Sequence, residues 1–227
     1  MDMGIPVTEL NLHGAHLELL PAGAGGRAAL ETFVHDTYAR AYGADVREFM
    51  PLFIALRTQA GEPLAVMGVR SAAQQTLFLE QYLDAPVEQV IHSRGGCAVR
   101  RERVVELGNL AVAHAGAARW MIVALNAFLR GAGVEWVALT AVPALRNAFA
   151  HVGIDLTELA QADGARLGAA RARWGSYYDS KPVVLAGDVA QGFERLQQAM
   201  QLEHACSLLR GLWEQSLADG RLARAWR

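Results

Sequence analysis

The sequence is poor in lysine, in cysteine and in long apolar runs, and each shortage excludes a class of protein. Among 21 basic side chains the only lysine is Lys181, so arginines and backbone amides are the available phosphate ligands. The two cysteines, Cys97 and Cys206, lie far apart without CxxC spacing, which predicts neither a zinc site nor a disulfide framework. The seven histidines show no HExxH pattern, so no metal is expected.

Membrane, secretory and nucleic-acid-binding signals are also missing. The longest apolar stretch, residues 111–129, is interrupted by His114, Arg119 and Asn126, whereas a spanning helix needs about 20 apolar residues. No Lys or Arg precedes Arg27, so no secretory signal is predicted. The net charge of −2 gives no reason to expect nucleic acid, and we expect a cytoplasmic protein.

What the chain does have is enough apolar material for a core. Its 227 residues are 52% hydrophobic and 19% charged, which favours a folded domain over disorder. We expect residues 1–187 to form one α/β domain with a mixed central sheet flanked by helices. Residues 188–227 read as one or two amphipathic helices, a C-terminal helical extension.

The first half of the chain predicts a helix and then a hairpin. Apolar residues recur at helical spacing over residues 30–41. The apolar runs 51–58 and 64–69 are joined by a turn containing Gly and Pro, which is typical of antiparallel strands. Residues 76–91 are expected to form short helices around Pro86.

A strand–helix–strand unit follows. Residues 104–112, VVELGNLAV, are the best candidate for a central strand, and the next helix ends at Gly131 and Gly133 before a second strand, 134–142. A right-handed crossover makes these two strands parallel. We then expect a helix over 143–151, a further helix carrying Leu156, Leu159 and Leu167, and a last strand at 181–187.

This order of elements resembles the GCN5-like N-acetyltransferase (GNAT) fold, whose fourth strand leads into a phosphate-binding loop and a helix. Gly116 and Ala118 match the last two positions of that loop, while Ala113 replaces the first. The resemblance implies that backbone amides at the helix start hold a pyrophosphate, with Arg119 as an added cationic contact. An exposed helix arginine is the alternative for Arg119.

Four sequence blocks resemble the thermostable hemolysin family over residues 27–187: YGA at 42–44, LFLEQYLD at 77–84, VELGNLA at 105–111 and WGSYYD at 174–179. The family name implies lysis of red cells, a role that the absent signal peptide and spanning segment do not support.

The same frame is similar to the acyl-homoserine-lactone synthases, which move a fatty acyl group from a carrier thioester to an amine. Residues 68–70, ending in Arg70, resemble the segment after the third strand, and residues 106–112 resemble Glu-Leu-Ser-Arg-Phe-Ala-Val at the fourth. Gly108 and Asn109 stand in place of Ser-Arg, so S-adenosylmethionine is not carried over as the acceptor. The resemblance implies acyl-CoA or an acyl carrier protein as donor and Arg70 as a substrate contact.

Glu106 is the first candidate for catalysis, because a carboxylate in an apolar strand must be paired, hydrogen-bonded or protonated. Burial would raise its pKa into the range of a general base that deprotonates an ammonium acceptor. An ion pair with Arg70 or Arg103 is the open alternative. Asn109 beside Gly108 predicts a bulge, where the amide of Leu110 or Ala111 would stabilise an oxyanion.

The WGSYYD run supplies Trp174, Tyr177, Tyr178 and Asp179, aromatic walls and a carboxylate that suit a small amine-bearing acceptor. Packing of these aromatics under a loop is the alternative. Cys97 lacks a nearby His and an orienting partner and is not predicted to be a nucleophile.

The leading hypothesis is an enzyme, an N-acyltransferase that takes an acyl group from acyl-CoA or acyl carrier protein and gives it to a small amine. Two other readings stay open: a membrane-active hemolysin with Trp213 and Trp226 on its C-terminal helices, and a module that binds an acyl ligand without turnover. Those helices would equally serve a homodimer or the docking of a carrier protein.

Overall fold

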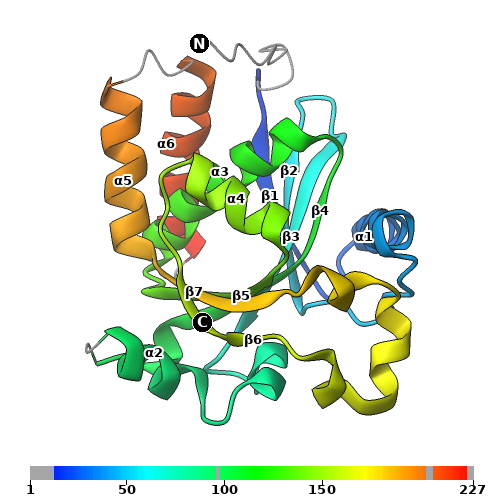
Figure 1. The fold of residues 1–227 in the computed structure, drawn as a ribbon. Helices are drawn as coiled ribbons and strands as arrows, with labels where there is room; N and C mark the ends of the chain where they lie inside the picture. The colour runs from blue at the N-terminus through cyan, green and yellow to red at the C-terminus, as the bar shows by residue number, and fades with distance from the viewer. Residues whose placement is uncertain (1–12, 96–97, 203–206, 224–227) are drawn as a thin grey trace, which may run out of the picture.

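The computed structural model describes residues 13–95, 98–202 and 207–223, so Cys97, Cys206 and Trp226 lie outside the described residues. Seven strands of this part form one mixed sheet in the order β1-β2-β3-β4-β5-β7-β6, which confirms the predicted α/β class (Figure 1). They are β1 (His16–Pro21), β2 (Leu52–Arg57), β3 (Pro63–Ser71), β4 (Val104–Val112), β5 (Trp136–Ala141), β6 (Thr157–Gln161) and β7 (Val183–Asp188).

The predicted strand–helix–strand unit occupies the middle of the sheet. β1, β2, β3 and β4 pair successively in antiparallel fashion, and β4 pairs with β5 in parallel. The antiparallel strands β7 and β6 complete the other half. The hairpin, the central strand and the parallel crossover expected from the sequence are therefore confirmed.

Helices cover both faces of the sheet (Figure 1). One face carries α3 (Ala115–Ala132), α4 (Pro143–His151), α5 (Val189–Leu202) and α6 (Ser207–Leu222). The other carries α1 (Arg27–Tyr42), α2 (Val87–Gly95) and the short helices η2 (Phe78–Tyr82), η4 (Gly164–Trp174) and η5 (Tyr177–Ser180). A further short helix, η3 (Arg101–Arg103), leads into β4.

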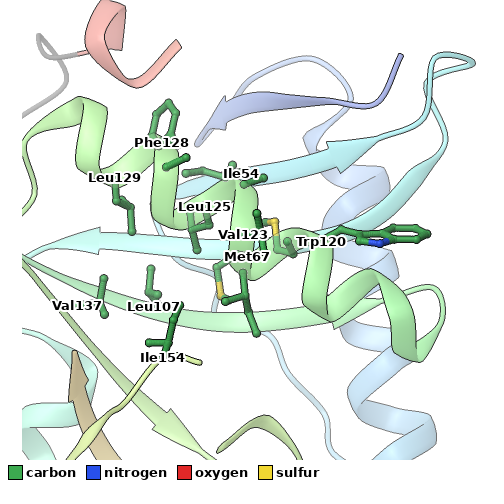
Figure 2. Packing of buried hydrophobic residues seen from close by; sticks show 14 of the residues in the cluster. Ile54, Met67, Leu107, Trp120, Val123, Leu125, Phe128, Leu129, Val137 and Ile154 are labelled. Atoms are coloured by element: carbon green, nitrogen blue, oxygen red, sulfur yellow. The ribbon is translucent and has the colours of Figure 1, made fainter. Parts of the chain in front are cut away.

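The largest core lies between α3 and the sheet (Figure 2). Leu125 and Phe128 of α3 are buried above strand residues such as Met67 and Leu107. Side chains alternate along a strand, so placing Leu107 in this core turns its neighbour Glu106 toward the opposite face. The apolar pattern of β4 thus decides on which side of the sheet the carboxylate lies.

The C-terminal helices pack against this body. The aromatic ring of Trp213 on α6 stacks on Phe193 of α5 at 4.6 Å, and α6 crosses α3 where Gly220 meets Gly131. A Cβ atom at Gly220 would lie 2.0 Å from the carbonyl oxygen of Phe128. Only a glycine permits this backbone approach.

Gly220→Ala is therefore expected to lower the free energy of unfolding by about 1–3 kcal/mol, because α6 must move away from α3. Gly211→Ala on the same helix is the matched control. A Cβ at Gly211 meets nothing within 4 Å, and alanine is the better helix former. Chemical denaturation measures both variants, and equal stability of the two would contradict the close crossing.

One predicted element is wrong. The segment carrying Leu156, Leu159 and Leu167 is not a helix but the edge strand β6 followed by η4. Thr157 and Gln161 pair with β7, whose hydrogen-bonding edge would otherwise be unpaired. Within β6 only Leu159 is buried, and Leu167 reaches the same core from η4.

Candidate active site

The central sheet forks at one point. β4 and β5 are paired only as far as Leu107 and Leu139, although β4 continues to Val112 and β5 to Ala141. Beyond that point the facing edges of the two strands have no pairing with each other. Backbone groups of both strands are left for another partner at the fork.

The bulge predicted at Gly108–Asn109 is present at this fork. Gly68 pairs with Gly108 but Val66 pairs with Ala111, so β4 contains one residue more than β3 across the same span. Asn109 has a φ of 48°, a left-handed backbone that is uncommon outside glycine. The extra residue reverses the alternation, so Ala111 faces the α1 side that Glu106 also faces.

A pocket opens on this side of the fork. It encloses about 900 Å³ including its open mouth, and residues of α1, β3, β4, β5, η2, η4, η5 and the segment 45–50 line it. Six of the predicted site residues lie in its wall: Arg70, Glu106, Asn109, Trp174, Tyr177 and Tyr178. Three of the four sequence blocks that resemble the hemolysin family, 77–84, 105–111 and 174–179, therefore contribute to one cavity.

Glu106 is held by the backbone of η2. Its Oε2 accepts a hydrogen bond from the Phe78 amide at 2.8 Å, and its Oε1 accepts one from the Leu79 amide at 2.9 Å. Nη1 of Arg70, the cross-strand neighbour, lies 3.6 Å from Oε2. Of the two ion pairs left open by the sequence, the structure contains the one with Arg70, whereas Arg103 lies near Glu135.

Burial dominates the ionisation of this carboxyl group, which is 2% exposed. Desolvation raises the pKa of Glu106 from 4.5 to about 7, against the opposing effects of the Phe78 amide, Arg70 and the Leu79 amide. A carboxylate with this pKa exchanges protons near neutral pH, which is what a general base needs.

The raised pKa makes stability depend on pH with a defined sign. The folded state binds the Glu106 proton more tightly than the unfolded chain, so this contribution is complete below pH 4.5 and is lost as the pH rises through about 7. We expect a loss on the order of 3 kcal/mol across this window, since one pKa unit is about 1.4 kcal/mol. Urea denaturation at several pH values measures it, and Glu106→Gln is expected to remove most of the slope.

Arg70 has hydrogen-bonding capacity left over. Its Nε is buried without a partner, and so is the hydroxyl of Thr140 on β5. Both residues line the pocket. Buried polar groups are normally bonded, so an unpaired donor and an unpaired hydroxyl in one cavity indicate a polar occupant.

Aromatic side chains form one wall of the pocket, and the hydroxyl of Tyr177 donates to the carbonyl of Thr140 on β5 at 3.5 Å. The ring of Tyr177 contacts those of Tyr42 at 5.1 Å and Trp174 at 5.3 Å, and it stacks on Tyr38 at 6.3 Å. Burial raises the pKa of Tyr177 well above its ordinary value, so this phenol stays neutral. The hydroxyls of Tyr82 and Tyr178 share a hydrogen bond, so packing and pocket lining coexist in one cluster.

Two family blocks distant in sequence meet behind this wall. The amide of Ser176 donates to the carbonyl of Tyr42 at 2.9 Å, and the amide of Asp45 donates to the carbonyl of Arg173 at 2.6 Å. The YGA and WGSYYD blocks are thus hydrogen-bonded to each other. These hydrogen bonds join residues 42–45 to residues 173–176, which together we call the rim of the pocket, and they hold Trp174 and the neighbouring Tyr177 in place.

Asn109 and the paired glycines position the segment before β2. The side-chain oxygen of Asn109 accepts a hydrogen bond from the Met50 amide at 2.9 Å. The Met50 side chain fills the space where a Cβ at Gly108 would lie, 2.5 Å from its Cε. Asn109 therefore links β4 to the segment that precedes β2, and both Asn109 and Met50 line the pocket.

The other predicted residues lie outside the pocket wall. The amide of Leu110 is hydrogen-bonded to the hydroxyl of Tyr38. Burial raises the pKa of Tyr38, and this hydrogen bond acts in the opposite direction. Ala111 is buried beneath α1. Gly116, Ala118 and Arg119 occupy the start of α3, two residues after β4 ends, and Asp179 is exposed on η5. Their binding roles stay predictions.

The pocket residues that were not anticipated include Met50, Tyr82 and Thr140. Tyr82 belongs to the LFLEQYLD block, which was the signal available for it. Thr140 lies in an apolar strand and Met50 before a hairpin, where neither the residue type nor the spacing indicates chemistry.

Metal and membrane elements were sought within the same residues. In the described ranges, no cluster of three or more His, Cys, Asp or Glu is placed to hold a metal ion. No helix in this part of the chain combines the length and the apolar character needed to cross a bilayer.

Solved structures share this architecture. FeeM, an N-acyl amino acid synthase from uncultured soil microbes, matches with a TM-score of 0.57 and 14% identity, over 83% of this chain and 98% of its own. BjaI, a CoA-dependent acyl-homoserine lactone synthase solved with SAM and isopentyl-CoA, matches at 0.56 and 11% identity, over 88% and 99%. TofI, solved with an inhibitor and MTA, matches at 0.53 and 14%, over 80% and 96%.

The forked, bulged sheet and these likenesses define a GNAT-like α/β protein with the architecture of the acyl-homoserine lactone synthases. The chain belongs to the thermostable hemolysin family, which residues 21–193 match. No curated protein matches the sequence.

Proposed function

We propose that this protein is an N-acyltransferase that moves an acyl group from a thioester donor, acyl-CoA or acyl carrier protein, to a small amine. The observation that carries the proposal is Glu106, a buried carboxylate with a pKa near neutrality in a pocket at the fork of the sheet. The likeness to synthases of N-acyl amino acids and acyl-homoserine lactones is consistent with it.

The chemistry needs one proton acceptor and no covalent enzyme intermediate. Glu106 takes a proton from the acceptor's ammonium group, directly or through water, and the neutral amine attacks the thioester carbonyl. The carbon–sulfur bond then breaks, the amide forms, and the sulfur leaves as a thiol after taking up a proton. The protonated Glu106 supplies that proton, and the freed carboxylate then takes the second proton of the attacking nitrogen and releases it to solvent.

The donor is proposed to enter through the fork, where β4 and β5 are no longer paired. Its pyrophosphate or phosphate would lie at the start of α3, where the first amides of a helix point out of its end and where Gly116, Ala118 and Arg119 lie. The amides of Leu110 and Ala111, next to the bulge, are the proposed donors to the thioester oxyanion, which would replace the Tyr38 hydroxyl at the Leu110 amide.

The acceptor is proposed to carry a carboxylate beside its amine, as an amino acid does. The unpaired Nε of Arg70 supplies the donor for that carboxylate, and Arg70 lies directly beside Glu106. Trp174, Tyr177 and Tyr178 would enclose the acceptor's side chain, and Asp179, exposed outside the pocket wall, would act on the acceptor as it enters.

The purified protein mixed with acyl-CoA or acyl-carrier-protein donors and pools of amines tests the proposal. Free thiol should appear only when donor and acceptor are both present, with the matching N-acyl product in the mass spectrum. Tight donor binding without product from a broad pool of amines would indicate a binding module instead.

We do not propose membrane lysis. The apolar face that α6 would need for insertion, including Leu212 and Trp213, is buried against the α3 layer and Phe193.

A further inference from the structure

The two amides that hold Glu106 belong to a segment with its own anchor. Phe78 and Leu79 open η2, and both donate to the Glu106 carboxylate. Glu80 directly follows Leu79, and its carboxylate accepts hydrogen bonds from the Leu77 amide at 2.9 Å and the Val87 amide at 3.0 Å. Glu80 thereby joins the start of η2, which carries the Glu106 contacts, to the start of α2.

Arg101 in turn forms an ion pair with Glu80. Its guanidinium donates to Oε1 of Glu80 at 2.6 Å and to Oε2 at 3.0 Å, a two-pronged pairing that lysine cannot reproduce. The same group also donates to Glu88 of α2 at 2.8 Å and to the carbonyl of Ala72, just past β3, at 2.9 Å. One side chain therefore joins the end of β3, η2 and α2.

We propose that Arg101 is a positioning residue for Glu106, acting through Glu80 and the amides of Phe78 and Leu79. Arg101 does not line the pocket and touches no substrate. Arg101 acts on Glu106 through the backbone of η2. When η2 is held in place, the amides of Phe78 and Leu79 donate to the Glu106 carboxylate, and when η2 moves these two hydrogen bonds weaken.

Loss of Arg101 should shift the proton equilibrium of Glu106 in one direction. The groups that act on Glu106 are Arg70 of β3, Glu80 and Tyr82 of η2, and Tyr178, which is bonded to Tyr82. The two η2 amides and Arg70 lower the pKa of Glu106, and the charge of Glu80 raises it. Removing Arg101 weakens the amide bonds and leaves the charge of Glu80 uncompensated, and both changes raise this pKa further.

The test compares Arg101→Gln and Arg101→Lys with Arg100→Gln. Arg100 is the adjacent residue, paired with Glu135 on the surface, so it controls for the loss of an arginine. The acidic limb of kcat/KM for acyl transfer should move to higher pH by about half a unit or more in Arg101→Gln and by less in Arg101→Lys. Activity lost at pH 7 should return at higher pH. A lowered rate with an unmoved limb would overturn the proposal.

A second measurement does not require enzymatic activity. It separates this inference from the proposed function, because only the kinetic test above rests on that function. The pH dependence of unfolding, with and without Glu106→Gln, reports the proton affinity of Glu106 in the folded protein. In the Arg101→Gln background this Glu106-dependent step should lie at higher pH. If the step moves but no acyl transfer is found, the positioning role stands and the proposed function fails; if it does not move, the positioning role fails.

Discussion

Glu106→Gln is expected to lower kcat/KM for acyl transfer by about 10²–10⁴-fold, the usual range for loss of a positioned general base. Glutamine has the same shape, so the pocket keeps its form. Its amide, however, cannot accept the proton of an ammonium group. Glutamine also has one acceptor oxygen in place of two, so one of the two hydrogen bonds from the Phe78 and Leu79 amides is lost. Free thiol release at pH 7.5 measures the loss.

The matched control is Glu62→Gln, the same substitution on the exposed turn between β2 and β3. It should leave the rate unchanged, because Glu62 precedes the start of β3, at the opposite end of that strand from Arg70, and is not part of the pocket wall. Retention of more than about a tenth of the activity in folded Glu106→Gln would remove Glu106 from the role of base.

Gly175→Ala is expected to destabilise the fold by more than about 3 kcal/mol, the upper end of the strain from an unfavourable backbone conformation. Gly175 has φ 51° and ψ −127°, and a Cβ there would lie 2.1 Å from the carbonyl oxygen of Tyr42. That carbonyl accepts the Ser176 amide, so the pairing of the YGA and WGSYYD blocks must open. The melting temperature should fall by about 10 °C.

Gly168 allows the two causes to be separated. It has nearly the same backbone, φ 54° and ψ −130°, but a Cβ at this position meets nothing within 4 Å. Gly168→Ala therefore measures the strain alone, about 1–3 kcal/mol, and the excess in Gly175→Ala measures the collision with Tyr42. Equal losses in the two variants would mean that the 42–45 and 173–176 segments are not in close contact.

The elements that the sequence predicts well are those that local residue patterns determine. The β-branched and apolar residues of 104–112 identified β4, and the apolar helix that follows it identified the crossover to β5. Glu106 was found by the same reasoning, because one carboxylate interrupts an otherwise apolar strand. Gly108 next to Asn109 was enough to anticipate the bulge.

Long-range pairing was beyond the reach of such patterns. The leucines at 156 and 159 fit a helix or a strand equally, and only the free edge of β7 decides for β6. The anchoring of η2 by Arg101 joins residues 21 positions apart, and the rim joins segments more than 130 apart. Thr140 is distinguished only by its place at the fork, which no local signal marks.

The pH profile of kcat/KM, measured for the native protein and Glu106→Gln with one donor and one amine, tests the central claim most directly. The account predicts that activity of the native protein rises through an acidic limb with a pKa near 7, and that the residual activity of the variant lacks this limb. The same limb in both proteins would contradict the assignment of proton transfer to Glu106.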